Sequence, residues 1–382
     1  MAEQTKLRVA GEHATTLVRA IGQDESLCLR EASPASTCRA CVDICPGKAL
    51  RLPASKGKDG GTKVTISKGF CIDCGLCAAV CPTNSIVVME PALRTLRRRL
   101  RNASAEADEG KHVYLTCVET GLAKNDLSVV EVACLGSLTW EMWANLMLDF
   151  PNLAVYLPGD ICGRCKAKVA EMMIVDEVLH AQQVTQSEMP LVETMRELDF
   201  TTSTGTFLPE RRKRMADAEK DSFSKILSDV TTKNPNADDD LPSEELGQLD
   251  ARKMRIRLRK EITRAEGEGT PGLIAGDQIL GTMTQRRWAI LDAAMRVPSI
   301  AERAQIDCVE VDADAADPEK LAQCVRECPL GAIGSDGVVC PELCTDCGLC
   351  KDILGEDSGV VRSVSTKVSD LLDDPDAAGA DD

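Results

Sequence analysis

The run CIDCGLCAAVCP, residues 71–82, constrains this chain more than any other feature of its sequence. Its four cysteines are separated by two, two and three residues, and a proline follows the last one. A loop with this spacing can turn three thiolates towards one bound group, whereas the fourth points towards another. The proline ends the turn and fixes the direction in which the chain leaves it. The run therefore predicts two neighbouring cysteine sites.

The cysteine content indicates metal or redox sites. There are 19 cysteines in 382 residues and only three histidines, so ligands other than thiolates are scarce. The first 22 residues contain neither the apolar core of a signal peptide nor a twin-arginine pair, so we expect a cytoplasmic chain. In a reducing cytosol, closely spaced cysteines are typical of metal sites rather than disulfides.

Composition excludes several classes of function. The net charge of −16 argues against nucleic-acid binding, and no apolar run is long enough for a membrane span. No Walker loop, G-x-S-x-G or H-E-x-x-H motif occurs, so we predict no catalytic residues. GEGTPG at 267–272 fits a dinucleotide fingerprint only formally, because it follows a charged helix and contains a proline.

From about residue 28 to residue 90 the chain resembles the two-cluster [4Fe–4S] ferredoxins of bacteria. The likeness rests on the run at 71–82, CVDICPGKAL at 41–50 and CPTNSIVV at 81–88. It implies two clusters, the first held by Cys45, Cys71, Cys74 and Cys77, and the second by Cys38, Cys41, Cys81 and one more cysteine. The family pattern places that last ligand at Ala35, so we expect Cys28 to replace it through the longer loop LREASPAST. Two four-cysteine zinc sites are the alternative.

A second, degenerate copy of the ferredoxin unit is expected near the C-terminus. LCTDCGLC at 343–350 nearly repeats residues 70–77, and CVRECPLGAIG at 324–334 matches residues 41–50. One ligand set is complete, namely Cys328, Cys344, Cys347 and Cys350, and it implies one [4Fe–4S] cluster. The other set is lost, with Pro318, Leu321 and Leu354 at ligand positions. We expect the remaining cysteines to be buried thiols, with an extra site as the alternative: Cys308, Cys324 and Cys340.

The middle of the chain alternates strand and helix patterns. HVYLTC, SVVEVACLG and LAVYLPGD are expected strands. SLTWEMWANLMLDF is an expected helix with Ser137 as its cap and an apolar stripe, and AKVAEMMIVDEVLHAQQ is another. This alternation predicts a parallel sheet covered by helices.

Four cysteines follow these strands, at the edge where open parallel sheets bind ligands: Cys117, Cys134, Cys162 and Cys165. The layout resembles the small iron–sulfur subunit of methyl-viologen-reducing hydrogenases, which implies a [2Fe–2S] centre. The CGRC step does not match that family residue by residue. Structural zinc and a thioredoxin-like dithiol at Cys162 and Cys165 are the alternatives.

The predicted fold is thus α+β ferredoxin-type modules flanking a small α/β parallel-sheet domain, with a helical linker region. The expected divisions are an N-terminal extension at 1–27, a two-cluster ferredoxin domain at 28–91, an α/β four-cysteine domain at 110–185, a helical and partly flexible linker at 190–300, a degenerate ferredoxin domain at 301–365 and an acidic tail at 366–382. Basic stretches at 92–102, 210–215 and 251–260 are either docking faces for an acidic partner or solvated helix faces.

These features predict a multi-cluster iron–sulfur protein that transfers electrons. Several clusters in one chain favour a subunit that relays electrons between other redox subunits of an anaerobic oxidoreductase complex, of the hydrogenase, formate dehydrogenase or heterodisulfide reductase type. One alternative is an oxidoreductase with its own organic cofactor in the middle domain. Another is a cluster-based redox sensor, against which the charge and the missing DNA-reading motif argue.

Overall fold

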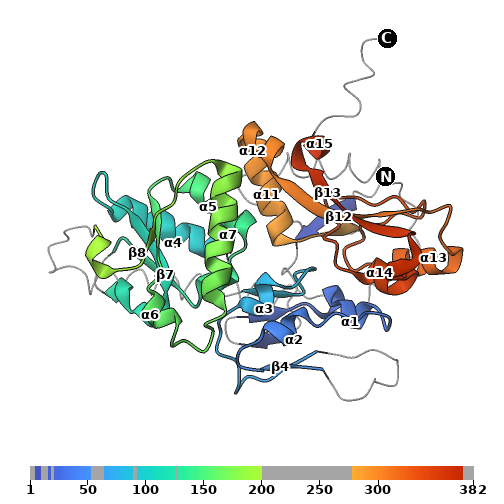
Figure 1. Ribbon diagram of the computed structural model, residues 1–382, viewed down its shortest axis with the longest axis horizontal. Coiled ribbons are helices and arrows are strands. Elements are labelled where there is room, and N and C mark those ends of the chain that lie inside the picture. The colour runs from blue at the N-terminus through green and yellow to red at the C-terminus, as the bar shows by residue number, and fades with distance from the viewer. Residues whose placement is uncertain are drawn as a thin grey trace, which may run out of the picture.

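The structure is a computed structural model, and it describes residues 5–9, 16–18, 21–52, 64–88, 93–124, 127–199 and 278–372. Three parts lie against one another in Figure 1: an N-terminal part in blue, a middle domain in green and a C-terminal domain in orange and red. Several predicted segments fall outside the described residues, namely the basic stretches at 210–215 and 251–260, most of the predicted linker and the end of the acidic tail from residue 373.

The N-terminal part has the two short antiparallel sheets and short helices of a ferredoxin. Strands β2 (Thr16–Val18), β3 (Ile21–Gln23) and β6 (Ile86–Val88) form one sheet, and β4 (Leu50–Arg51) pairs with β5 (Thr65–Ile66) in the other. The helices are α1 (Leu29–Ala32), α2 (Ala40–Ile44) and α3 (Leu76–Ala79). The core between them includes Ile21, Leu50 and Ile86 together with Cys77 and Cys81, so cysteine side chains occupy positions that aliphatic residues would otherwise fill.

The middle domain contains the expected parallel sheet. Its four strands run in the order β10 (Leu191–Val192), β9 (Leu153–Tyr156), β7 (Val113–Cys117) and β8 (Val129–Val132). The helices of this domain are α4 (Leu93–Glu106), α5 (Trp140–Asp149), α6 (Gly159–Cys162) and α7 (Ala170–Thr185). Leu96 and Leu100 of α4 are buried in its core, so the basic stretch at 92–102 turns its leucine stripe towards the sheet.

One detail of the expected helix at 137–150 is wrong. The apolar stripe is buried as predicted, but α5 begins at Trp140 with Thr139 as its cap. Residues Leu135–Ser137 instead form a 3₁₀ turn, and Ser137 Oγ donates to the carbonyl of Cys134 at 2.8 Å. The hydroxyl that the sequence offered as a helix cap therefore closes the turn that presents Cys134.

The C-terminal domain packs helices around a long two-stranded sheet. Strand β12 (Gln305–Val311) pairs antiparallel with β13 (Val361–Lys367). Its helices are α11 (Gln285–Arg296), α12 (Pro298–Arg303), α13 (Pro318–Glu327), α14 (Leu349–Leu354) and α15 (Val368–Leu372). Val368 and Leu371 are buried, so ordered structure continues past residue 365. Two strands far apart in the chain also pair in parallel, β1 (Thr5–Val9) and β11 (Gln278–Met283).

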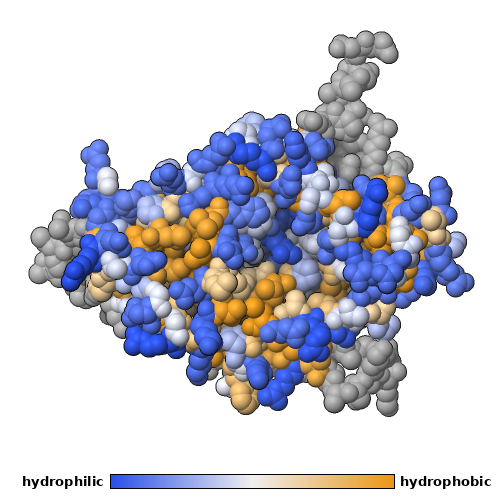
Figure 2. Space-filling model, in the orientation of Figure 1, coloured by the Kyte–Doolittle hydropathy of each residue, from blue (hydrophilic) through white to orange (hydrophobic). Residues whose placement is uncertain are grey.

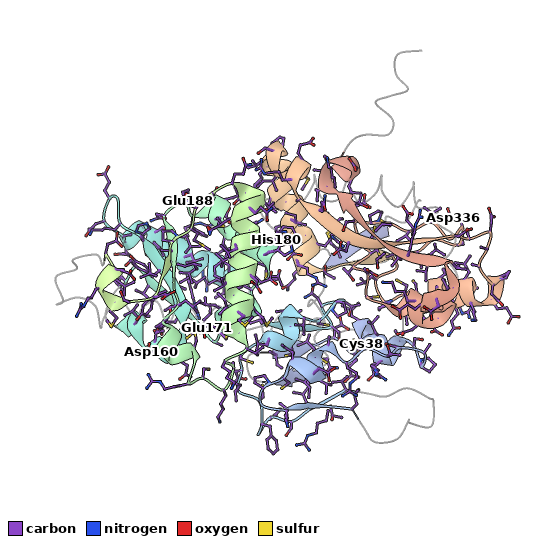
Figure 3. The ribbon with its side chains drawn as sticks, in the orientation of Figure 1. Cys38, Asp160, Glu171, His180, Glu188 and Asp336 are labelled. Atoms are coloured by element: carbon purple, nitrogen blue, oxygen red, sulfur yellow. The ribbon has the colours of Figure 1, made fainter. Side chains whose placement is uncertain are left out.

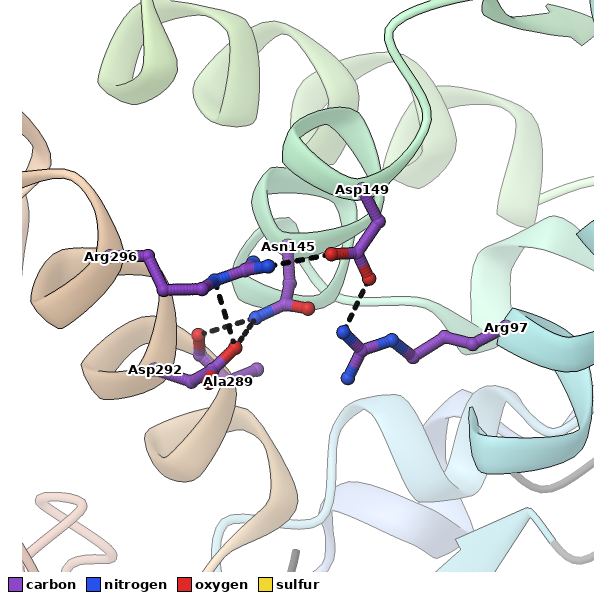
Figure 4. Close-up of polar contacts among 6 residues, drawn as sticks. All are labelled: Arg97, Asn145, Asp149, Ala289, Asp292 and Arg296. Atoms are coloured by element: carbon purple, nitrogen blue, oxygen red, sulfur yellow. Dashed lines mark hydrogen bonds and ion pairs between the residues drawn. The ribbon is translucent and has the colours of Figure 1, made fainter. Parts of the chain in front are cut away.

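Helices α5 and α11 join the middle and C-terminal domains (Figure 4). Asn145 Nδ2 donates to Asp292 Oδ2 at 2.7 Å, and Arg296 Nη1 donates to Asp149 Oδ1 at 2.6 Å. Asp149 also forms an ion pair with Arg97 of α4. Because Asp149 is shared by two guanidinium groups from different elements, it fixes both helices against α5.

In Figure 2, hydrophobic residues gather over the middle domain and over the N-terminal part below it, and hydrophilic residues cover most of the rest of this face. No helix among the described residues is long and apolar enough to cross a membrane.

Candidate functional site

The first cysteine site lies between α1, α2 and the loop after α3. Cys28, Cys38, Cys41 and Cys81 line one cavity with an empty volume of about 400 Å³, together with apolar side chains such as Leu29, Val64 and Ile86. Burial raises the pKa of the Cys28, Cys38 and Cys41 thiols, and in each case the negative charge of Cys81 adds to the effect. Four cysteines from three separate segments therefore line one cavity.

The long loop between Cys28 and Cys38 is held by an arginine inside it. Arg30 Nε donates to the carbonyl of Cys38 at 2.7 Å, and Arg30 Nη2 donates to the carbonyl of Thr37 at 2.8 Å. These two bonds hold the far end of the loop against α1, so Cys38 and Cys28 line the same cavity. Ala35, at the position where ferredoxins have a cysteine, is not among the residues that line the cavity.

The second site joins the end of α2 to the loop before α3. Burial raises the pKa of Cys71, Cys74 and Cys77, and the charge of Cys45 adds to it in all three. Ala49 N–H donates to Cys45 Sγ at 3.2 Å. The four sulfurs expected to share a cluster are thus neighbours. The charge of Cys41 also acts on Cys77, so the first and second sites adjoin each other.

The third site lies at the carboxyl edge of the parallel sheet. Cys117 ends β7 and Cys134 follows β8, whereas Cys162 ends α6 after β9 and Cys165 lies in the bend that follows. Burial raises the pKa of Cys134 to about 12, and the charges of Cys74, Cys117 and Cys165 add to it. The pKa of Cys162 is raised to about 11, first by burial and then by the charge of Cys117. The carboxylates of Asp160 and Glu171, both labelled in Figure 3, also help to raise the pKa of Cys162.

The second and third sites meet where α3 enters the middle domain. Leu76, between Cys74 and Cys77, is completely buried in the core of the middle domain rather than that of its own part. A Cβ at Gly136 would lie 2.7 Å from Leu76 Cδ2, and a Cβ at Gly75 would lie 2.8 Å from the Cβ of Ser137. Glycine at these two positions lets the loops that carry Cys74 and Cys134 approach closely.

The fourth site is in the C-terminal domain. Cys328, Cys344, Cys347 and Cys350 line a cavity with an empty volume of about 400 Å³. Burial raises the pKa of Cys328 to about 11 and that of Cys344 to about 12, and the charge of Cys350 adds to both.

The second and fourth sites share a local geometry. Ala332 N–H donates to Cys328 Sγ at 3.4 Å, as Ala49 does to Cys45. The backbone φ is +47° at Asp346 and +59° at Asp73, and the glycine two residues later also has a positive φ in both loops. The sequence repeat is therefore a repeat of backbone conformation as well.

Cys324 is a neighbour of the fourth site that sequence reasoning left out. It is fully buried, and its thiol hydrogen-bonds with that of Cys350, which together with burial raises the pKa of Cys350. The signal was in the repeat, because Cys324 aligns with Cys41. The other two unassigned thiols are buried and contact polar groups: Cys308 Sγ is 3.6 Å from Thr366 Oγ1, and Cys340 donates to Glu342 at 3.2 Å.

The donor chemistry of all four sites fits iron–sulfur clusters. Four such buried sulfurs can act together as thiolates only where a cationic group neutralises them, because bare thiolates there would repel one another and lack water. Backbone N–H groups two residues further along the chain also hydrogen-bond the sulfurs and lower their pKa, as Leu76 does for Cys74, Gly136 for Cys134 and Leu349 for Cys347. Such bonds tune cluster potentials. Among the described residues, no set of three or more histidine, cysteine, aspartate or glutamate side chains is arranged so that it could hold a single metal ion.

Comparison with known protein families identifies the N-terminal sequence. Two family models, each described as a 4Fe-4S dicluster domain, match residues 36–85 and residues 70–124. The first match contains seven of the predicted ligands, and the second extends from the run at 71–82 past the end of β7. No curated protein matches the chain. Residues 36–124 are therefore ferredoxin-type iron–sulfur sequence, which suggests a role in electron transfer.

Proposed function

We propose that this chain is a subunit that relays electrons within an anaerobic oxidoreductase complex, of the hydrogenase, formate dehydrogenase or heterodisulfide reductase type. It would hold three [4Fe–4S] clusters, two in the N-terminal part and one in the C-terminal domain, and a fourth centre in the middle domain. The dicluster family matches support the first two clusters. The repeated N–H···S geometry around Cys328 supports the third.

The observation that carries this proposal is the contact between sites. Cys41 of the first site and Cys77 of the second belong to one apolar cluster, and Cys74 of the second and Cys134 of the third pack against another. A carrier that shuttles freely needs one or two clusters, whereas a chain of adjoining sites suits electron passage between two partners. Each bound cluster would accept and release one electron, and the chain's backbone N–H groups and buried walls would set its potential.

Residues around the middle site favour iron there over zinc. Zinc does not change oxidation state, so it would interrupt an electron path between the second and third sites. Gly136 N–H bonds the Cys134 sulfur, and Ala167 N–H donates to Cys165 Sγ at 3.4 Å. Hydrogen bonds of this kind would raise the potential of an iron centre.

The test is anaerobic purification with bound partners, followed by iron and sulfide counting and electron paramagnetic resonance. Three cubanes and one [2Fe–2S] centre correspond to about 14 irons per chain. Co-purifying redox subunits and at least four reducible centres support the proposal. Stoichiometric zinc in the middle domain, with no reducible signal from it, contradicts the assignment of that centre, and a flavin absorbance band would favour an enzyme with its own organic cofactor.

A further inference from the structure

The first turn of α11 lies where all three parts of the molecule meet. Gln285 N–H donates to Asn84 Oδ1 at 3.1 Å, and Arg286 Nη2 donates to the carbonyl of Pro82 at 3.1 Å. Pro82 directly follows Cys81, so the Arg286 guanidinium is bonded to the loop of the first cysteine site. Helix α11 itself belongs to the C-terminal domain, whose core contains Ile290 and Leu291.

The next residue, Arg287, reaches the fourth site. Its side chain is only 7 % exposed, and Nη2 donates to the carbonyl of Asp307 at 2.9 Å and to the carbonyl of Cys344. Burial lowers the pKa of Arg287, and the carboxylate of Glu141 is the main charge that opposes this shift. An arginine keeps its charge even so. A buried positive charge is therefore bonded to a predicted cluster ligand.

We infer that Arg286 and Arg287 form a charged bridge between the first and fourth cysteine sites, and that they raise the reduction potentials of the clusters there. The inference rests on the proposed function, because it requires clusters at both sites. It adds that the C-terminal site belongs to the same relay as the N-terminal sites. Along this relay, neighbouring sites follow one another in the order third, second, first and fourth.

The physical basis is the charge that each electron brings. Reduction adds one negative charge to a site, and a nearby cation stabilises the reduced form more than the oxidised form. The interaction with Arg287 is weakly screened because the side chain is buried, whereas partly exposed Arg286 acts more weakly. When an electron moves between the first and fourth sites, the cluster that gives it up is oxidised and the cluster that receives it is reduced. No proton is transferred, and no covalent bond forms or breaks.

A second contact holds the two sites together at the same boundary. Thr37 N–H donates to Asp352 Oδ2 at 2.8 Å, and Thr37 Oγ1 donates to Asp352 Oδ1 at 3.0 Å. Thr37 directly precedes Cys38, which Figure 3 labels in the N-terminal part below the C-terminal domain. Asp352 follows Cys350 by two residues. The Asp352 carboxylate also adds negative charge near Cys38, and the Arg30 guanidinium opposes it.

The test is redox titration of the full-length, anaerobically purified protein, followed by electron paramagnetic resonance. Signals are first assigned with Cys28→Ser for the first site and Cys344→Ser for the fourth. Arg287→Gln should make the fourth site about tenfold harder to reduce, or about 59 mV lower for one electron. Arg286→Gln should lower the potential of the first site by less. Glu141→Gln should shift the fourth site in the opposite direction.

Two variants serve as controls. Arg362→Gln removes an exposed arginine that pairs with Glu310 in the same domain, and it should leave every potential unchanged. Arg287→Lys keeps the charge and should shift the fourth site less than Arg287→Gln. Unchanged potentials in Arg286→Gln and in Glu141→Gln would overturn the bridge even if Arg287→Gln failed to fold. A wild-type protein without a cluster at the fourth site would instead overturn the proposed function.

Discussion

Replacing Leu76 with alanine should loosen the joint between the N-terminal part and the middle domain. Leu76 is fully buried in the core of the middle domain, and its Cδ2 packs against Gly136. The change removes three carbon atoms, which is roughly 2.4 kcal/mol at about 0.8 kcal/mol per buried methylene. The backbone at Gly136 offers no side chain to fill the space, so a cavity term adds to this loss. We expect the free energy of unfolding to fall by about 3–5 kcal/mol.

The measurement is guanidinium chloride unfolding of the anaerobic holoprotein, followed by far-ultraviolet circular dichroism. Leu179→Ala is the matched control, because Leu179 on α7 is 52 % exposed and should change the stability by less than about 0.5 kcal/mol. The same samples should show a weaker magnetic interaction between the centres at Cys74 and Cys134 in the Leu76 variant. A stability loss below about 1 kcal/mol with an unchanged magnetic interaction would refute the idea that the two parts share a core.

Three further predictions follow from the site geometry. Cys28→Ser should abolish the cluster of the first site and spare that of the second, whereas Cys45→Ser should do the reverse. Iron counting and spin quantification measure how many clusters each variant keeps. Retention of every cluster in Cys28→Ser would show that another residue is the ligand. Cys134→Ala should remove the reducible signal of the middle domain, and its persistence would exclude this ligand. Burial and a hydrogen bond to Asp199 raise the pKa of Tyr114 to about 12. The neutral phenol therefore stabilises the fold fully below the pKa of tyrosine in the unfolded chain, about 10. This stabilisation is lost as the pH rises through about 12. Asp199→Ala should lower that pKa in an ultraviolet titration, and no change would contradict the role of the hydrogen bond.

Sequence spacing predicted the features that depend on a few neighbouring residues. The parallel sheet of the middle domain followed from alternating strand and helix patterns, and the family matches support the ferredoxin-type reading of the N-terminal region. The run at 71–82 predicts that Cys71, Cys74 and Cys77 share one site, because a short loop and a proline set the direction of each thiol. The start of α5 was missed because Ser137 is used locally, to close the turn at Cys134.

Contacts between the three parts had no signal in the sequence. Leu76 reads as part of a cysteine loop, although it fills the core of another domain. Arg287 reads as one basic residue on a surface helix, yet it is buried against the carbonyl of Cys344. Both depend on residues that are distant in the chain, so no local period or spacing reveals them. Cys324 differs, because comparison of the two repeats could have drawn attention to it.

The pairing of β1 with β11 has a consequence for the order of assembly. Thr5 pairs with Gln278, so the strand that β1 pairs with in the described part of the chain is made only after more than two thirds of the sequence has been synthesised. All eight predicted ligands of the N-terminal part, in contrast, have been made by residue 81. Contacts between distant segments form late because loop closure is unfavourable. Iron could therefore enter the N-terminal sites during translation, while β1 still presents an open strand edge that a chaperone or a second nascent chain can bind.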